Sequence, residues 1–258
     1  MNQKGLKEFL DSKVELYNNR KFIESDPIQI PHHLNDIGAS KEDIEIIGFL
    51  VATIAWGNRK SIITNGKRLV NIMGNSPFDF IVNYTNNDSK YLSGFVHRTF
   101  NENDLNYFIV ALQHIYLHHN GIESLFSRNI KGDSLQYAIH KFKKVFFSLP
   151  HLPRTEKHVS DPLKNSAAKR INMYLRWMVR NDQKDVDFGL WNSISPSLLS
   201  CPLDVHTGNV SRKLGLITRK QNDAKALKEL DQSLRELDPI DPVKYDFALF
   251  GLGVFESF

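Results

Sequence analysis

The sequence predicts an all-α protein, and three observations support this fold class. Apolar residues recur at helical spacing in most segments, as between Asn103 and His119. Several of these segments follow a residue that commonly caps a helix, such as Ser40. No segment shows the alternation of apolar and polar residues that is typical of a half-buried strand. With 258 residues, the chain can hold one large domain or two small ones with a sizeable core.

The first half of the chain is predicted to form successive helices. Residues 1–24 have the pattern of an amphipathic helix, and Asp26 to Pro31 is expected to be extended. Ser40 and Asp43 have the spacing of a capping box, ahead of a helix to about Trp56. That helix is apolar nearly all round, so we expect it at the centre of the core. Further helices are expected at residues 61–73, 77–84, 103–119 and 134–147.

The second half contains the best candidate for a junction. Residues 148–153 include two prolines and are predicted to be a loop between subdomains. Helical patterns then cover residues 165–180 and 205–214. A helix is also expected at residues 224–237, and an apolar segment at residues 245–255 closes the chain.

Lys169 is a candidate nucleophile in the first of these helices. Ser166 is a good N-cap, which would place Lys169 three residues inside the helix. The positive end of the helix dipole and the neighbouring Arg170 would then lower the pKa of the amine and favour its neutral form. Arg176 and Arg180 share the helix face of Lys169, opposite the apolar face. The alternative is a solvated basic face with no chemistry.

Asp204 is a candidate carboxylate partner for an amine. It follows Pro202 and comes directly before a helix, where aspartate is a favoured N-cap. The capping role and a chemical role are compatible, because helix amides would hold the carboxylate in place and keep it ionised.

Charge and composition indicate a soluble protein that binds an anionic partner. The formal net charge is +4, and the excess of lysine and arginine collects at residues 154–180 and 204–220. This distribution suits a phosphate-rich partner, although a chance cluster is an alternative. The single cysteine, Cys201, excludes an internal disulfide and a four-cysteine iron–sulfur cluster. The longest apolar run is too short to span a bilayer and we find no signal peptide, so we expect a cytoplasmic, nucleoid-associated location and no membrane partner.

Two histidines one helical turn apart, His114 and His118, have a spacing that could suit a metal. No carboxylate or cysteine at ligand spacing accompanies them, so we interpret them as structural residues near a helix end and expect no metal.

Three segments resemble the helix–hairpin–helix DNA glycosylases, in the branch of the 8-oxoguanine glycosylases. Pro202-Leu203-Asp204-Val205-His206 resembles the segment that carries the catalytic aspartate. Ser166-Ala167-Ala168-Lys169 resembles the start of the helix that carries the lysine of the bifunctional members. Ile54 to Ile62 resembles a segment whose polar side chains enter the DNA. The whole chain looks closer still to an uncharacterised bacterial family related to these glycosylases. In place of the glycine-rich hairpin stands Val159 to Asn165.

The resemblance implies an architecture of two helical subdomains with a DNA- and base-binding cleft between them. Residues 1–258 would form one glycosylase-like unit. A barrel-like helical subdomain with the hairpin would span about residues 41–175, and a second subdomain would combine residues 1–40 and 176–258.

The resemblance also implies a function: excision of a damaged base, such as an oxidised purine, from double-stranded DNA by a monomer without a cofactor. Lys169 would form a Schiff base with the sugar, and Asp204 would stabilise the positive charge that develops there. Asn58 would fill the space left by the flipped base, although it could equally be a helix C-cap after Gly57. The other DNA-binding residues would be Arg59, Lys164, Arg170, Arg176, Arg180, His206 and Arg212.

Two other functions stay open. A nucleic-acid binding protein could keep the scaffold without turnover, which the missing glycine hairpin would favour. A helical interaction protein could use the basic patch to bind an acidic protein partner. Salt-dependent binding to damaged duplex and strand cleavage distinguish these three alternatives.

Overall fold

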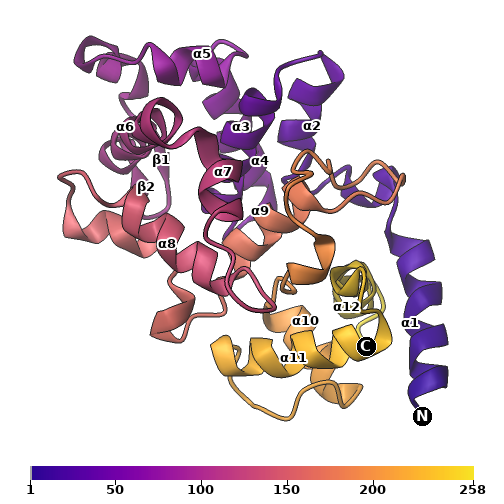
Figure 1. The fold of residues 1–258 in the computed structure, drawn as a ribbon. Coiled ribbons are helices and arrows are strands. Elements are labelled where there is room, and N and C mark those ends of the chain that lie inside the picture. Colours follow the sequence, from indigo (N-terminus) through magenta and orange to yellow (C-terminus); the bar gives the residue numbers. More distant parts are fainter. Residues whose placement is uncertain (1) are drawn as a thin grey trace. The chain divides into compact units, whose positions relative to one another are not determined.

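The computed structural model describes residues 2–258, apart from the side chain of Phe22. The chain divides into two compact units (Figure 1). The first, here called the terminal unit, comprises the chain up to Phe22, Ile130–His140 and Asp161–Phe258. The second, the central unit, comprises Ile23–Asn129 and Lys141–Ser160. Nearly all regular structure is helical, so the all-α prediction is confirmed.

The helices and strands lie within these units, except that α8 runs from the terminal unit into the central unit. The terminal unit holds α1 (Gln3–Tyr17), the start of α8 (Gln136–Phe146), α9 (Lys169–Val179), α10 (Val205–Lys213), α11 (Ala224–Leu237) and α12 (Tyr245–Phe255). The central unit holds α2 (Gln29–Asp36), α3 (Lys41–Ile54), α4 (Arg59–Ile72), α5 (Pro77–Val82), β1 (Val96–His97), β2 (Phe100–Asn101), α6 (Glu102–His119) and α7 (Gly121–Ser127). None of the described helices is long and apolar enough to cross a membrane.

The core of the terminal unit forms around α12, the last helix of the chain. This helix packs against α1 and α10 (Figure 1). Two glycines make the approach close: a Cβ at Gly251 would lie 2.2 Å from the ring of Tyr17, and one at Gly253 would lie 3.0 Å from Cβ of His206. The apolar face of α11 completes this core with Leu227, Leu230 and Leu234.

The core of the central unit forms around α3, as its apolar sequence predicted. Ser40 and Asp43 form the predicted capping box, and all residues from Asp43 to Ile54 are buried. Phe49 contacts a cluster of aromatic rings at centroid distances of 5.4 to 5.8 Å: Phe108, Phe142 and Phe146. Burial of such rings is a large apolar contribution to stability.

Three features differ from the sequence-based expectations. The segment from Asp26 to Pro31 is not extended, because α2 begins at Gln29 and tolerates Pro31 in its first turn. The antiparallel strands β1 and β2 were not predicted, since two residues each are too few to show alternation. The predicted boundaries at residues 40 and 175 do not coincide with the two units: α9 lies with the C-terminal helices.

Candidate functional site

Lys169 is the first residue of α9, so its side chain lies in the first turn of that helix. The N-cap is Ala168, whose backbone is left-handed (φ 46°, ψ 39°) and whose side chain offers no cap. The Ser166 hydroxyl accepts from the amide of Ala168 at 3.1 Å, so it bonds to an amide that lies before the first residue of the helix. The prediction that Ser166 caps the helix, with Lys169 three residues inside, is therefore wrong, because the left-handed turn at Ala168 starts the helix later.

Asp204 is the N-cap of α10, as predicted. Its Oδ1 accepts from the amide of Thr207 at 2.9 Å, while its backbone carbonyl accepts from Gly208 and from the side chain of Asn222. The carboxylate is thus fixed at the positive end of a helix. One carboxylate oxygen remains for another partner.

That partner is Lys169. Its Nζ lies 3.6 Å from Oδ2 of Asp204, and the two side chains keep 34% and 19% of their accessible surface. The structure therefore brings together the two residues that the sequence singled out, although 34 residues separate them along the chain. Both charges lie at the starts of helices, and both are accessible to a ligand.

Further along α9, two arginines are buried in a network of carboxylates. Arg176 donates from Nε to Asp187 at 3.1 Å and from Nη1 to Asp246. Arg180 donates to Asp241 at 3.0 Å and to Asp187 at 3.2 Å. Burial alone would lower the pKa of Arg180, but the carboxylates of Asp187 and Asp241 raise it above its ordinary value. Burial raises the pKa of Asp187.

The expectation that Arg176 and Arg180 lie on an open basic face is therefore wrong, and their side chains offer no exposed cation to DNA. The helix face that they share is not a solvated basic face: Arg176 is 8% exposed and Arg180 is 2% exposed. Their guanidinium groups are engaged by carboxylates from outside the helix and are not available to phosphate groups.

A buried cysteine, Cys201, contacts two buried carboxyls near the start of α10. The Cys201 thiol donates to Oδ1 of Asp246 at 3.7 Å, and the Cys201 amide donates to Oδ1 of Asp231 at 3.0 Å. Burial raises the pKa of Asp246 and of Asp231 to about 6 each. Burial also raises the pKa of the Cys201 thiol, so it is not a reactive thiolate.

The segment before Lys169 forms a tight turn without glycine. Asp161 caps a short 3₁₀ helix, Pro162–Lys164, by accepting from the amide of Leu163 at 3.0 Å. Asn165 then takes the left-handed conformation (φ 64°), which asparagine adopts more readily than most residues. Asn165 is tied to the turn before α11, because its side chain donates to Asp223 at 3.3 Å. This segment leaves the side chain of Lys164 exposed.

The other predicted DNA-binding residues of the terminal unit differ in exposure. His206 is exposed in the first turn of α10. Arg212 is half-buried and holds the loop after α10 by donating to the carbonyl of Arg219 at 2.8 Å and to Asn222 at 2.5 Å. Arg170 is half-buried, and burial lowers its pKa to about 10.

Asn58 and Arg59 lie in the central unit at the start of α4. Asn58 is the N-cap of this helix, with Oδ1 accepting from the amide of Ser61 at 3.1 Å. The alternative of a helix C-cap is therefore wrong. Arg59 donates to the hydroxyl of Ser25 at 3.3 Å. Neither contact tests the predicted role of Asn58 as a wedge in DNA.

Comparison with known proteins identifies the family. Residues 26–255 match the model of the family described as "Protein of unknown function (DUF2400)". The chain belongs to the DUF2400 family. No curated protein and no solved structure matches it.

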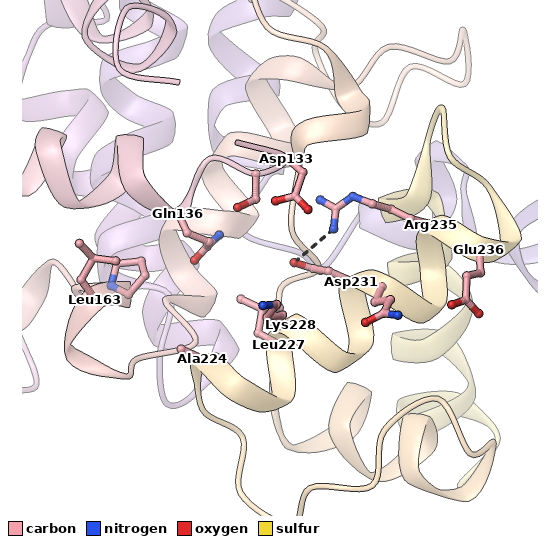
Figure 2. A pocket seen from close by; sticks show the side chains of 12 residues that line it. Asp133, Gln136, Leu163, Ala224, Leu227, Lys228, Asp231, Arg235 and Glu236 are labelled. Carbon is pink, nitrogen blue, oxygen red and sulfur yellow. Dashed lines mark ion pairs between the residues drawn. The ribbon is translucent and has the colours of Figure 1, made fainter. Parts of the chain in front are cut away.

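The DUF2400 chain also has a pocket in its terminal unit that the sequence did not predict (Figure 2). Its volume is about 580 Å³, and its walls come from α11, the turn at Pro162 and the start of α8. Asp231 and Arg235 face each other in it, 4.0 Å apart. Arg235 also donates to the carbonyls of Ser197 and Leu199, so its contacts stabilise the loop before Asp204.

Sequence reasoning missed the buried carboxyls of this DUF2400 protein, although one signal was present. Asp246 is the only charged residue in the apolar segment Tyr245–Phe255, and such an isolated charge indicates a buried group with a specific partner. No comparable signal marks Asp187, which lies in an irregular loop. Trp177 and Trp191 are 0% and 1% exposed and belong to the core.

Proposed function

We propose that the protein is a DNA glycosylase with AP lyase activity that excises a damaged base from double-stranded DNA. The observation that carries this proposal is the 3.6 Å approach of Lys169 Nζ to Asp204 Oδ2, at the starts of two helices and within reach of solvent. An accessible amine beside a fixed carboxylate is the minimal equipment for this chemistry, and the sequence resemblance assigns both residues to it.

Lys169 would act as the nucleophile once the damaged base is flipped out of the duplex. The amine attacks C1′ of the sugar while the glycosidic C–N bond breaks, and the electron pair of that bond leaves with the base, which takes up a proton. Loss of a proton from the nitrogen and opening of the sugar ring leave an imine between Nζ and C1′. Loss of a proton from C2′ then expels the 3′ phosphate, which leaves with the electron pair of the C3′–O bond, and the DNA strand is broken.

Asp204 would stabilise the positive charge that develops on the sugar as the base departs. Its position as the N-cap of α10 holds the carboxylate in place and prevents it from turning away. The 3.6 Å distance also lets the carboxylate relay the proton that the ammonium group must release before attack, and this proton passes on to the departing base.

The DNA-binding surface of the terminal unit would be smaller than the sequence predicted. Without Arg176 and Arg180, the proposal retains Lys164 on the turn before α9 and His206 on α10, both exposed, with Arg170 and Arg212 half-buried. Phosphate contacts by exposed cations such as Lys164 would position the duplex without reading its sequence. Asn58 and Arg59 remain proposed contacts from the central unit.

The decisive experiment is reductive trapping on a duplex that carries one abasic site. Borohydride reduces the imine to a secondary amine and leaves a covalent protein–DNA adduct that is visible on a denaturing gel. The intact protein should form this adduct, and Lys169→Gln should abolish it. The matched control is Lys164→Gln, which removes an exposed lysine five residues earlier and should keep the adduct.

Two results would contradict the proposal. An adduct that survives Lys169→Gln would assign the amine to another residue. If the intact protein traps no abasic duplex and cleaves no lesion-containing duplex in a panel of single-lesion oligonucleotides, a nucleic-acid binding protein without turnover becomes the better interpretation.

A further inference from the structure

Asp246 is a buried carboxyl in an otherwise apolar helix, and it has two specific partners. Arg176 donates from Nη1 to its Oδ2, and the Cys201 thiol donates to its Oδ1 at 3.7 Å. Asp246 keeps only 6% of its accessible surface. A carboxyl in such surroundings is held in one orientation, because rotation would lose both partners.

The packing of α12 against α10 places Asp246 close to the Lys169–Asp204 pair. Gly253 on α12 lies against His206, and the ring of Phe250, one turn earlier, lies 6.3 Å from the ring of His206. Asp246 is one further turn toward the start of α12, and therefore toward Asp204 at the start of α10. The contact between Asp246 and Cys201, three residues before Asp204, agrees with this register.

The charges of the pair act on Asp246. Burial raises the pKa of Asp246 to about 6, and the Arg176 guanidinium opposes that rise. The negative charge of Asp204 raises this pKa further, whereas the positive charge of Lys169 lowers it. The ionisation of Asp246 therefore depends on the charges of Asp204 and Lys169.

We propose that Asp246 is a positioning residue of the Lys169–Asp204 site, a second carboxyl whose protonation state sets the charge that the amine and the sugar experience. When Asp246 is neutral, the site holds one lysine and one carboxylate, Lys169 and Asp204. In its ionised form a second negative charge faces the pair and further stabilises positive charge on the sugar and on the imine nitrogen. The catalytic part of this inference rests on the proposed function, whereas the electrostatic coupling does not.

The groups that face Asp246 come from three elements. α9 contributes Arg176 and Lys169, the segment before α10 contributes Cys201, and the start of α10 contributes Asp204. Arg176 also binds Asp187, so its guanidinium keeps one carboxylate partner whatever the state of Asp246.

The terminal unit offers a matched control in Asp231. Burial raises its pKa to about 6 as well, and it also accepts a hydrogen bond from Cys201. Its charged neighbours are Arg235 and Asp133 rather than Lys169 and Asp204. A pKa change that comes from burial in general should therefore appear at both Asp246 and Asp231. A pKa change that comes from the Lys169–Asp204 pair should appear at Asp246 alone.

The test is a pH titration of the aspartate carboxyl carbons by carbon-13 NMR on the full chain. The Asp246 midpoint should fall in Asp204→Asn and rise in Lys169→Gln, by about half a unit to one unit in each case. The Asp231 midpoint should stay unchanged in both variants. Equal shifts at both carboxyls, or none at Asp246, would overturn the proposal. Because Asp246 itself is intact in these variants, the test does not depend on the folding of an Asp246 variant.

A second measurement adds the catalytic consequence. The rate of borohydride trapping should rise with pH as Asp246 ionises, and Asp246→Asn should lower the rate at pH 8 roughly three- to tenfold and remove this rise. Asp231→Asn should leave the profile unchanged. An unaltered profile in Asp246→Asn would limit Asp246 to a structural role and overturn the proposal. If no variant and no intact protein traps DNA, the proposed function fails, while the NMR titration still decides the coupling.

Discussion

Helix α9 carries cations in two different settings. Lys169, at its start, is one-third exposed and faces a single carboxylate at 3.6 Å. Arg176, two turns later, is buried between Asp187 and Asp246. An exposed ion pair contributes little to stability, whereas a buried cation whose partner is removed costs several kcal/mol. The second half of α9 is therefore held in the core by buried ion pairs, whereas its first turn stays open to a ligand.

The largest effect should come from Arg176→Ala, which breaks the buried network. The change leaves Asp187 and Asp246 without a common cation, so we expect a loss of about 3–5 kcal/mol in the free energy of unfolding. Urea denaturation measures this loss, and Lys169→Ala is the control, with an expected loss below about 1 kcal/mol. Equal losses would erase the distinction between the two ends of α9. If Arg176→Ala leaves the protein fully stable but weakens its binding to duplex DNA, Arg176 contacts DNA after all.

The next effect concerns the other side of the ion pair. Asp204→Asn should keep the cap of α10, because asparagine is an equally good N-cap, but it removes the negative charge. We expect near-normal stability with a loss of trapping or excision on the order of a hundredfold or more. Single-turnover kinetics on a lesion duplex, together with the thermal midpoint of unfolding, check both parts. Full activity in this variant would reduce Asp204 to a cap.

A smaller effect should come from Asp231, a buried carboxyl whose arginine partner, Arg235, lies 4.0 Å away. Its pKa of about 6 lies above the ordinary value of 3.8, so the folded protein retains this proton to higher pH than the unfolded chain does. Stability from this group therefore falls as pH rises from about 4 to 6 and stays low above that. Asp231→Asn should raise the free energy of unfolding by about 1–3 kcal/mol at pH 8 and by much less at pH 4. A gain of the same size at both pH values would show that charge is not the cause.

The smallest effect tests the turn that leads into Lys169. Asn165 is exposed and left-handed, so Asn165→Ala should cost about 1 kcal/mol, whereas Asn165→Gly should change stability by less than about 0.5 kcal/mol. Chemical denaturation of the two variants in parallel measures the difference. If alanine is tolerated as well as glycine, this turn is not held by its backbone conformation.

The parts of the fold that follow from local pattern could be predicted from the sequence. Residues 224–237 were predicted as a helix from periodicity alone, and α11 has these bounds. The Ser40–Asp43 capping box was predicted from two residues and their spacing. Asp204 was predicted as an N-cap for the same reason, because the signal lies within one turn of the helix that it begins.

The features that depend on distant residues could not be predicted in this way. A helical wheel assigns the face opposite the apolar one to solvent, and Arg176 and Arg180 were assigned there. Apart from Asp182, two residues after Arg180, their carboxylate partners lie 7 to 70 residues further along the chain: Asp187, Asp241 and Asp246. The start of α9 was misplaced because a left-handed alanine has no sequence signal, whereas glycine or asparagine would have indicated one.

The single thiol of the chain, Cys201, provides an intrinsic probe of local opening in the terminal unit. Cys201 is 0% exposed; its thiol donates to Asp246 and its backbone amide donates to Asp231. A thiol reagent can reach it only when this part of the terminal unit opens, so the labelling rate reports the frequency of that opening. Since no other cysteine is present in the chain, the signal needs no engineered probe. A duplex that binds at Lys169 and Asp204 should slow the labelling, so the labelling rate of Cys201 also reports whether the site is occupied.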